Sequence, residues 1–153
     1  MSDYDVLCIG NANVDIIAQC DEAFLADNGI VKGAMNLIDT ARAEELYARM
    51  GPALEASGGS AGNTAAGIAS LGGRAAFFGK VAKDQLGRIY THDIRAQGVA
   101  FDTEPLPGEP PTARSMIFVT PDGERSMNTY LGACMELGPE DVEADKAAGA
   151  KIT

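Results

Sequence analysis

The chain has 153 residues, of which 46% are apolar and 22% are charged, a composition typical of a folded domain rather than a disordered one. A formal net charge of −10 disfavours nucleic acid as a partner, because its phosphates would be repelled. No stretch reaches the roughly twenty apolar residues of a membrane span, and the acidic start, MSDYDVLCIG, lacks the basic segment of a signal peptide. Cys8, Cys20 and Cys134 are widely spaced and odd in number, which predicts buried, reduced thiols and a cytoplasmic location.

Most of the chain alternates short apolar runs with helical patterns. In chain order the predicted elements are strands at 6–9, 14–20 and 34–38, a helix that begins at Asp39 or Thr40 and includes Leu54, a helix over 63–71, a strand at 75–78 and a helix over 84–97. Strands that alternate with helices predict an α/β fold built on a layered sheet.

The segment after residue 112 has a different pattern. Thr-Pro-Asp-Gly-Glu at 120–124 predicts a turn between two alternating runs, 115–119 and 125–131. An antiparallel hairpin does not fit a helix-covered parallel core, so we expect it to form a small separate sheet with 14–20 and 34–38. The chain then continues as a predicted helix over 139–148 and the first residues of a strand at 151–153, which predicts that it is the front part of a longer protein.

Residues 57–73, SGGSAGNTAAGIASLGG, place glycines and small polar residues at the start of a predicted helix. Free amides there can bind a phosphate, but the G-x-G-x-x-G pattern is absent and the Walker pattern fails at Val81. A neutral, hydroxyl-rich ligand that contacts the main chain, Ser60 and Asn63 fits better. The alternative is that the glycines only permit close packing of the helix against the sheet.

A second candidate site is Gly-Asn-Ala-Asn-Val-Asp at 10–15, directly after the first predicted strand. Open α/β sheets bind ligands beyond the carboxyl ends of their strands. The carboxylate of Asp15, beside two amides, is suited to accept hydrogen bonds from paired sugar hydroxyls. The alternative is that an Asn-rich turn serves the backbone conformation alone.

Five further polar or glycine positions received simpler predictions. Asp84 is predicted to cap a helix and Gly87 to be a packing contact. His92 is predicted to lie on the solvated side of the 84–97 helix. Lys80 and Lys83 either attract anions toward the sheet edge or are solvated.

Three blocks of this sequence carry a family resemblance. GNANVD, SGGSAGNTAAGIASLGG and FFGKVAKDQLGRIYTHDIRAQGV closely resemble the front half of the ribokinase and adenosine kinase superfamily, the PfkB carbohydrate kinases. The resemblance covers essentially the whole chain. Gly-Gly-Ser-x-x-Asn is similar to the adenosine kinase branch whereas Asn13 is similar to ribokinase, so the substrate stays open.

The resemblance implies ATP- and magnesium-dependent transfer of phosphate to a hydroxymethyl group of a sugar or nucleoside, and it allows for a monovalent cation. It implies a ribokinase-like fold with a Rossmann-type layered sheet, in which the elements at 14–20, 34–38 and 112–131 form a β-sheet lid, through which a homodimer can form. At matching positions Asp15 would bind sugar hydroxyls, with support from Asn11 or Asn13. The other substrate-binding residues that it implies are Gly58, Gly59, Ser60, Asn63, Arg114 and Met116.

One part of the family pattern is missing. The second signature, Asp-Thr-x-Gly-Ala-Gly-Asp, which supplies the anion hole and the catalytic base, has no match in this sequence. We therefore expect residues 1–153 to be the N-terminal part of the kinase, without a catalytic residue or metal ligand, and inactive alone. ATP and magnesium would bind mainly to the absent C-terminal half. The alternatives are a non-catalytic sugar- or nucleoside-binding module and a fragment that only mediates dimerisation.

Overall fold

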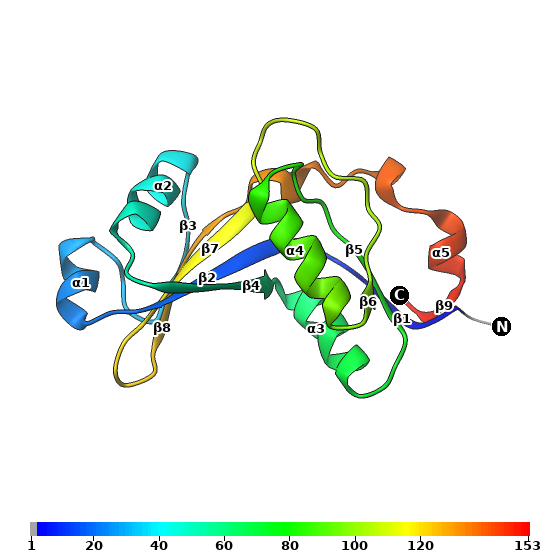
Figure 1. The fold of residues 1–153 in the computed structure, drawn as a ribbon, viewed down its shortest axis with the longest axis horizontal. Coiled ribbons are helices and arrows are strands. Elements are labelled where there is room, and N and C mark those ends of the chain that lie inside the picture. Colours follow the sequence, from blue (N-terminus) through cyan, green and yellow to red (C-terminus); the bar gives the residue numbers. More distant parts are fainter. Residues whose placement is uncertain (1–2) are drawn as a thin grey trace.

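The fold is described for residues 3–153 of a computed structural model, in which two sheets lie next to each other along the longest axis (Figure 1). No helix within these residues is both long and apolar enough to cross a membrane. The strands are β1 Tyr4–Ile9, β2 Asn13–Gln19, β3 Met35–Leu37, β4 Ala53–Gly58, β5 Ala75–Phe78, β6 Val99–Ala100, β7 Ala113–Val119, β8 Arg125–Tyr130 and β9 Ala150–Ile152. The α-helices are α1 Glu22–Asp27, α2 Thr40–Arg49, α3 Ser60–Ser70, α4 Gln85–Ala96 and α5 Ala144–Ala148.

The first sheet, called the parallel sheet, has the order β6-β5-β1-β9 with every pair parallel. Successive side chains of β5 point to opposite faces. Phe77 belongs to the core that also contains Tyr90 and Ile94 of α4, whereas Phe78 packs with Val142 and Ala147 near α5. Both faces of β5 are therefore buried, which explains its uninterrupted apolar sequence.

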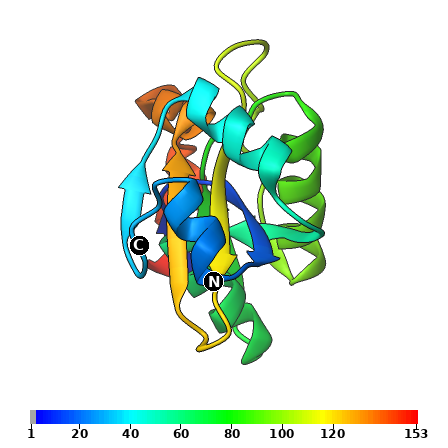
Figure 2. The same cartoon turned by 90° about the vertical axis from the view of Figure 1, so that its left-hand side faces the viewer.

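The second sheet, called the mixed sheet, has the order β3-β8-β7-β2-β4. β2 and β7 are parallel, although Asn13 pairs with Ala113 across a long stretch of chain, and β7 and β8 form an antiparallel hairpin. In Figure 2, α1 and α2 lie over one face of this sheet. The Phe24 ring of α1 contacts the Phe118 ring of β7, with 5.0 Å between the ring centroids, so this face has a packed apolar core.

Most sequence-based element predictions are confirmed, including the separate sheet formed by 14–20, 34–38 and the hairpin. The predicted caps are also confirmed. The Asp39 carboxylate accepts a hydrogen bond from Arg42 N, and the Asp84 carboxylate accepts one from Gly87 N, both at 2.8 Å. A side chain on Gly87 would overlap the Ala82 carbonyl, which confirms the predicted packing contact.

Several predictions were wrong in detail. The helix that begins at Thr40 ends at Arg49, and Leu54 belongs to β4, because Pro52 follows and the residue before a proline disfavours helix. The predicted helix over 139–148 is instead a 3₁₀ turn at Pro139–Asp141 followed by the short α5. β6 was not predicted.

The cysteines and lysines also differ in part from expectation. All three cysteines are free, but only Cys134 is buried, whereas Cys8 and Cys20 are half-buried. Lys80 is neither solvated nor available to anions. It is buried and forms an ion pair of 2.5 Å with Asp141.

Candidate functional site

A cavity of about 350 Å³ lies where the two sheets meet. This volume is within the range of small-molecule sites. Its wall comes from the end of β1 and the turn after it, the start of α3, and strands β3 and β8 of the mixed sheet. The lining residues are Ile9, Gly10, Asn11, Asn13, Met35, Leu37, Gly59, Ser60, Ala61, Thr129 and Leu131. None of these side chains is charged, so the cavity suits an uncharged ligand rather than a phosphate.

Asp15 lies directly behind the cavity wall. Its carboxylate accepts a hydrogen bond of 2.9 Å from the side-chain amide of Asn13, which itself lines the cavity. Burial raises the pKa of the Asp15 carboxyl, while the charge of Arg125 and the Asn13 hydrogen bond oppose this shift. The carboxylate is therefore partly dehydrated and has acceptor capacity beyond the single bond from Asn13.

The polar character of the site continues across the mixed sheet. Asp15 pairs with Ser115 in the neighbouring strand, and Ser115 pairs with Thr129 in the next. The hydroxyls of Ser115 and Thr129 are hydrogen-bonded at 2.8 Å. Because paired residues in adjacent strands project from the same face, these three side chains form one polar row that ends at the cavity, where Thr129 is a lining residue.

The structure explains the adjacent glycines that join the two sheets. A side chain at Gly58 would overlap the Asp15 carboxylate, and one at Gly59 would overlap the Asn11 carbonyl. Gly59 also has φ of +89°, a conformation that disfavours any residue with a side chain. The space beside these glycines is thus filled by the chain itself. Packing within the chain therefore explains why both positions lack a side chain, whereas contact of a ligand with the main chain stays a prediction, and Gly59 lines the cavity.

The structure brings only part of the predicted set together. Asn11, Asn13, Gly59 and Ser60 line the cavity, with Asp15 adjacent to them. Asn63 is exposed in the first turn of α3 and does not line the cavity. Its backbone amide donates to Gly59 O at 2.8 Å.

Arg114 and Met116 are not placed with this group. They flank Ser115 in β7, so they project from the face of the mixed sheet opposite to Asp15. The Arg114 guanidinium lies 6.0 Å from the centre of the Tyr130 ring, and Met116 is fully buried in the core. Neither side chain contributes to the cavity lining.

Sequence reasoning missed the apolar part of the wall. Ile9, Met35 and Leu37 are at least half exposed, at 51%, 57% and 63%, although they are large apolar side chains. They surround the cavity together with Leu131. The predicted lid range contained Met35, Leu37 and Leu131, but the pairing of β3 with β8 that brings them to the cavity joins segments far apart in the chain.

The cavity residues offer no set of ligands for magnesium or for nucleotide phosphates. No group of three or more His, Cys, Asp or Glu residues within 3–153 is arranged to hold a metal ion. The lining has no cationic side chain, and the Cβ positions of Gly58 and Gly59 leave no cradle for a phosphate. These residues therefore fit neither group.

Comparison with known proteins agrees with this geometry. The sequence profile of the family described as pfkB family carbohydrate kinase matches residues 4–152. The chain is 78% identical to adenosine kinase from Sinorhizobium meliloti, whose crystal structure superposes with a TM-score of 0.92 over 98% of this chain and 46% of that one. It is 74% identical to a probable sugar kinase protein from Rhizobium etli CFN 42, with a TM-score of 0.93 over 99% of this chain and 46% of that one.

A plant relative is more distant. Probable fructokinase-4 of Arabidopsis thaliana is 34% identical over 106 residues, which cover 65% of this chain and 31% of that protein. The chain therefore spans less than half the length of the relatives that it matches. The fold is that of the adenosine kinases and ribokinase-like proteins, and the profile match covers nearly every residue. The chain belongs to the pfkB family of carbohydrate kinases.

Proposed function

We propose that the chain is the acceptor-binding part of an ATP-dependent kinase that phosphorylates a hydroxymethyl group of a nucleoside. The observation that carries this proposal is the uncharged cavity, which has a polar wall at Asn11, Asn13 and Thr129 and an apolar wall at Met35 and Leu37. A nucleoside combines a hydroxyl-rich sugar with a flat, largely apolar base. The two walls match these two parts.

Asp15 has the central role in acceptor binding. Its carboxylate would accept hydrogen bonds from two sugar hydroxyls, because the Asn13 amide already holds one of its oxygens in a fixed position. Hydrogen bonds to a charged acceptor contribute about 1.5–3 kcal/mol each. Bound ATP and magnesium would supply the phosphoryl group and its charge neutralisation. This chain's residues would hold the acceptor and exclude water from it.

A free sugar is the second candidate acceptor. Similarity to plant fructokinases supports it, since probable fructokinase-4 of Arabidopsis thaliana is 34% identical over 106 residues and fructokinase of Solanum tuberosum is 32% identical over the same length. A free sugar leaves the side chains of Met35 and Leu37 without an apolar partner, whereas a nucleoside covers them. The apolar wall thus favours the nucleoside.

The mixed sheet is proposed to act as a lid over the acceptor. Met35, Leu37 and Leu54 are exposed at 57%, 63% and 67% on this sheet, and natural proteins rarely leave a sheet with such residues uncovered. Closure over a nucleoside would bury part of this surface, and a second copy could bury the rest in a dimer. Hydrogen exchange without added protection in β3 and β8 on ligand binding would count against closure, and light scattering that shows only monomers would count against the dimer.

Binding of the acceptor is tested by isothermal titration of the 153-residue chain with adenosine and with fructose. We expect adenosine to bind more tightly and Asp15→Asn to weaken binding by at least about tenfold, which corresponds to about 1.4 kcal/mol. Asp27→Asn is the matched control, because Asp27 is exposed at the end of α1. Equal binding by the wild-type chain and Asp15→Asn would remove Asp15 from the site, and tighter binding of fructose would replace the nucleoside with a sugar.

Phosphoryl transfer requires metal, donor and base to be positioned together. Since the cavity residues fit neither magnesium nor phosphate, we propose that the catalytic residue, ATP and magnesium belong to a C-terminal half. We expect no ADP release above background from the purified 153-residue chain with ATP, magnesium and adenosine. Turnover that survives repurification and disappears with Asp15→Ala would contradict this division of the kinase.

A further inference from the structure

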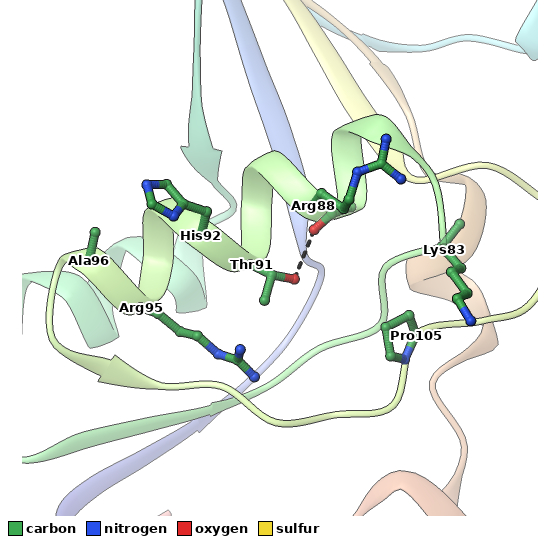
Figure 3. A pocket seen from close by; sticks show the side chains of 9 residues that line it. Lys83, Arg88, Thr91, His92, Arg95, Ala96 and Pro105 are labelled. Carbon is green, nitrogen blue, oxygen red and sulfur yellow. Dashed lines mark hydrogen bonds between the residues drawn. The ribbon is translucent and has the colours of Figure 1, made fainter.

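A second hollow lies away from the candidate acceptor site. It is a groove of about 700 Å³ between α4 and the segment that connects β6 to β7 (Figure 3). Pro105 comes from the connecting segment and Lys83 lies just before the start of α4, while Arg88, Thr91 and Arg95 come from the helix. Its lining residues are Ala82, Lys83, Gly87, Arg88, Thr91, His92, Arg95, Ala96 and Pro105.

The charge of this groove is opposite to that of the whole chain. Its lining contains three cationic side chains and a histidine, and no carboxylate, although the chain has 22 Asp and Glu residues. One neighbouring acid, Asp102, is paired with Arg95, and another, Asp84, is not available to neutralise the remaining cations. The Asp84 carboxylate accepts hydrogen bonds from Gly87 N and from both the amide and the hydroxyl of Thr112.

Two of these cations lack a carboxylate partner. Within residues 3–153, the Lys and Arg side chains that form no ion pair are Lys83, Arg88, Arg114 and Arg125. Arg114 lies over Tyr130, and the charge of Arg125 acts on Asp15. Lys83 and Arg88 alone have no such role, and both line the same groove.

The groove is preformed by backbone contacts. Lys83 N donates to Leu106 O and Leu106 N donates to Val81 O, both at 2.8 Å, which fixes the connecting segment beside α4. At the other end the Arg95 guanidinium donates to Phe101 O at 2.8 Å and to Asp102 at 3.2 Å. A ligand would therefore not need to order this wall, which lowers the entropic cost of binding.

We propose that this groove binds an organic phosphate, with the phosphate between Lys83 and Arg88 and the organic part against Ala82, Ala96 and Pro105. A guanidinium offers two parallel donors to a phosphate, and an ammonium adds a point charge. Small-molecule sites occupy about 300–1,000 Å³, so the groove is large enough for such a ligand. The uncharged acceptor cavity at the junction of the two sheets has none of these features.

The probe is phenyl phosphate, added to the ¹⁵N-labelled 153-residue chain, with inorganic phosphate and phenol as separate titrations. We expect saturable shifts of the amide resonances of residues 82–96 and 101–106, tighter binding of phenyl phosphate than of inorganic phosphate, and weaker binding at high salt. The double variant Lys83→Gln, Arg88→Gln should bind phenyl phosphate at least about tenfold more weakly, which corresponds to about 1.4 kcal/mol. Arg74→Gln is the matched control, since Arg74 is an exposed arginine outside the groove.

Because both altered residues are exposed, the double variant should keep the dispersed spectrum of the folded chain. Unchanged affinity in that variant, or shifts centred on Asn13 and Ser60, would overturn the proposal. So would the absence of saturable shifts. Binding of a polyglutamate peptide in preference to phenyl phosphate would also overturn it and assign the groove to an acidic protein surface.

Discussion

The parallel and mixed sheets are stabilised in different ways. In the parallel sheet, β5 is buried on both faces and its residues belong to two apolar clusters. The mixed sheet has α1 and α2 over one face, and its edge strands β3 and β4 leave Met35, Leu37 and Leu54 at least half exposed (Figure 2). The parallel sheet is thus buried on both faces at β5, and the mixed sheet presents partly uncovered edge strands, of which β3 lies beside the cavity.

The largest expected effect comes from removing one aromatic ring from each sheet. Phe77 is buried against Tyr90 and Phe101, with ring centroids 6.3 and 5.8 Å away, and Phe118 is buried against Phe24. Phe77→Ala and Phe118→Ala should each lower the free energy of unfolding by about 3–5 kcal/mol. Because Phe77 and Phe118 belong to one continuous core cluster, we expect a single urea transition in both variants.

The same variants test whether the two sheets unfold together. Circular dichroism reports the whole chain, and hydrogen exchange resolves each sheet. If Phe118→Ala unfolds the mixed sheet at a lower urea concentration than the parallel sheet, the two sheets are separate cooperative units. The core cluster would then not couple them.

The second largest effect is expected at the glycine between β4 and α3. Gly59→Ala should lower the free energy of unfolding by about 1–3 kcal/mol, because residues other than glycine are strained at positive φ and the new methyl group would meet the Asn11 carbonyl. Gly67→Ala, inside α3, is the control. Its added Cβ would meet no atom within 4 Å, so it should stabilise the helix by about 0.5–1 kcal/mol.

The glycine pair is measured by urea unfolding at the same protein concentration. Equal effects of both substitutions would show that the junction of the two sheets is not constrained at Gly59. A destabilised Gly59→Ala that still binds adenosine normally would confirm that this glycine serves the fold rather than the ligand.

Local sequence signals predicted most strands of both sheets and missed one strand in each, β6 in the parallel sheet and β4 in the mixed sheet. The continuous apolar runs of β1 and β5, and the acidic caps at Asp39 and Asp84, depend on neighbouring residues only. β4 was missed because Leu54 continues the helical spacing of α2, while its strand character depends on pairing with β2. Nonlocal pairing of this kind leaves little trace in a single sequence.

The candidate site shows the same division. Asn11, Asn13, Asp15 and Ser60 lie at the ends of local elements, so their proximity followed from the order of strands and helices. The order of elements did not determine which side chains of the hairpin lie on which face of the sheet. A shift of one residue along a strand moves a side chain to the other face, and this parity separates Ser115, on the Asp15 face, from the predicted Arg114 and Met116 on the opposite face.

Two partly buried carboxyls, Asp15 in the mixed sheet and Asp141 near the parallel sheet, should affect stability in opposite directions as pH changes. Burial raises the pKa of Asp15. A carboxyl whose folded pKa exceeds its unfolded pKa stabilises the fold below the unfolded pKa, about 4, and this contribution is lost as pH rises through the folded pKa. Asp15→Asn should therefore be more stable than wild type at neutral pH, and the difference should vanish below about pH 4.

Asp141 is the opposing case. Burial raises the pKa of its carboxyl, but hydrogen bonds from Lys80 and Gly138 outweigh burial and hold the pKa below the ordinary value. Its stabilising contribution is present above the unfolded pKa and is lost as pH falls through the folded pKa. Asp141→Asn should thus be less stable than wild type at neutral pH. Urea unfolding across the acid range that gives both variants the same sign would contradict this assignment.

The smallest effect is expected at the tip of the β7–β8 hairpin. Lys32 forms ion pairs of 2.5 Å with Glu22 and 2.6 Å with Asp122, so it ties α1 to the hairpin turn. All three side chains are substantially exposed, at 32%, 68% and 57%. Exposed ion pairs contribute about 0–1 kcal/mol and weaken with salt. Lys32→Met should therefore lower the free energy of unfolding by less than about 1 kcal/mol.

The position of this change matters more than its size. Because the ion pairs hold only α1 and the turn, amides of the turn at residues 120–124 should exchange faster in Lys32→Met, while amides of β1 and β5 exchange as in wild type. In 1 M salt the amide exchange rates of the wild-type turn should approach those of Lys32→Met, since the Debye length falls to about 3 Å and the ion pairs are screened. Faster exchange in β5 as well would show that the hairpin tip is coupled to the parallel sheet, and that the mixed sheet does not open independently of its base.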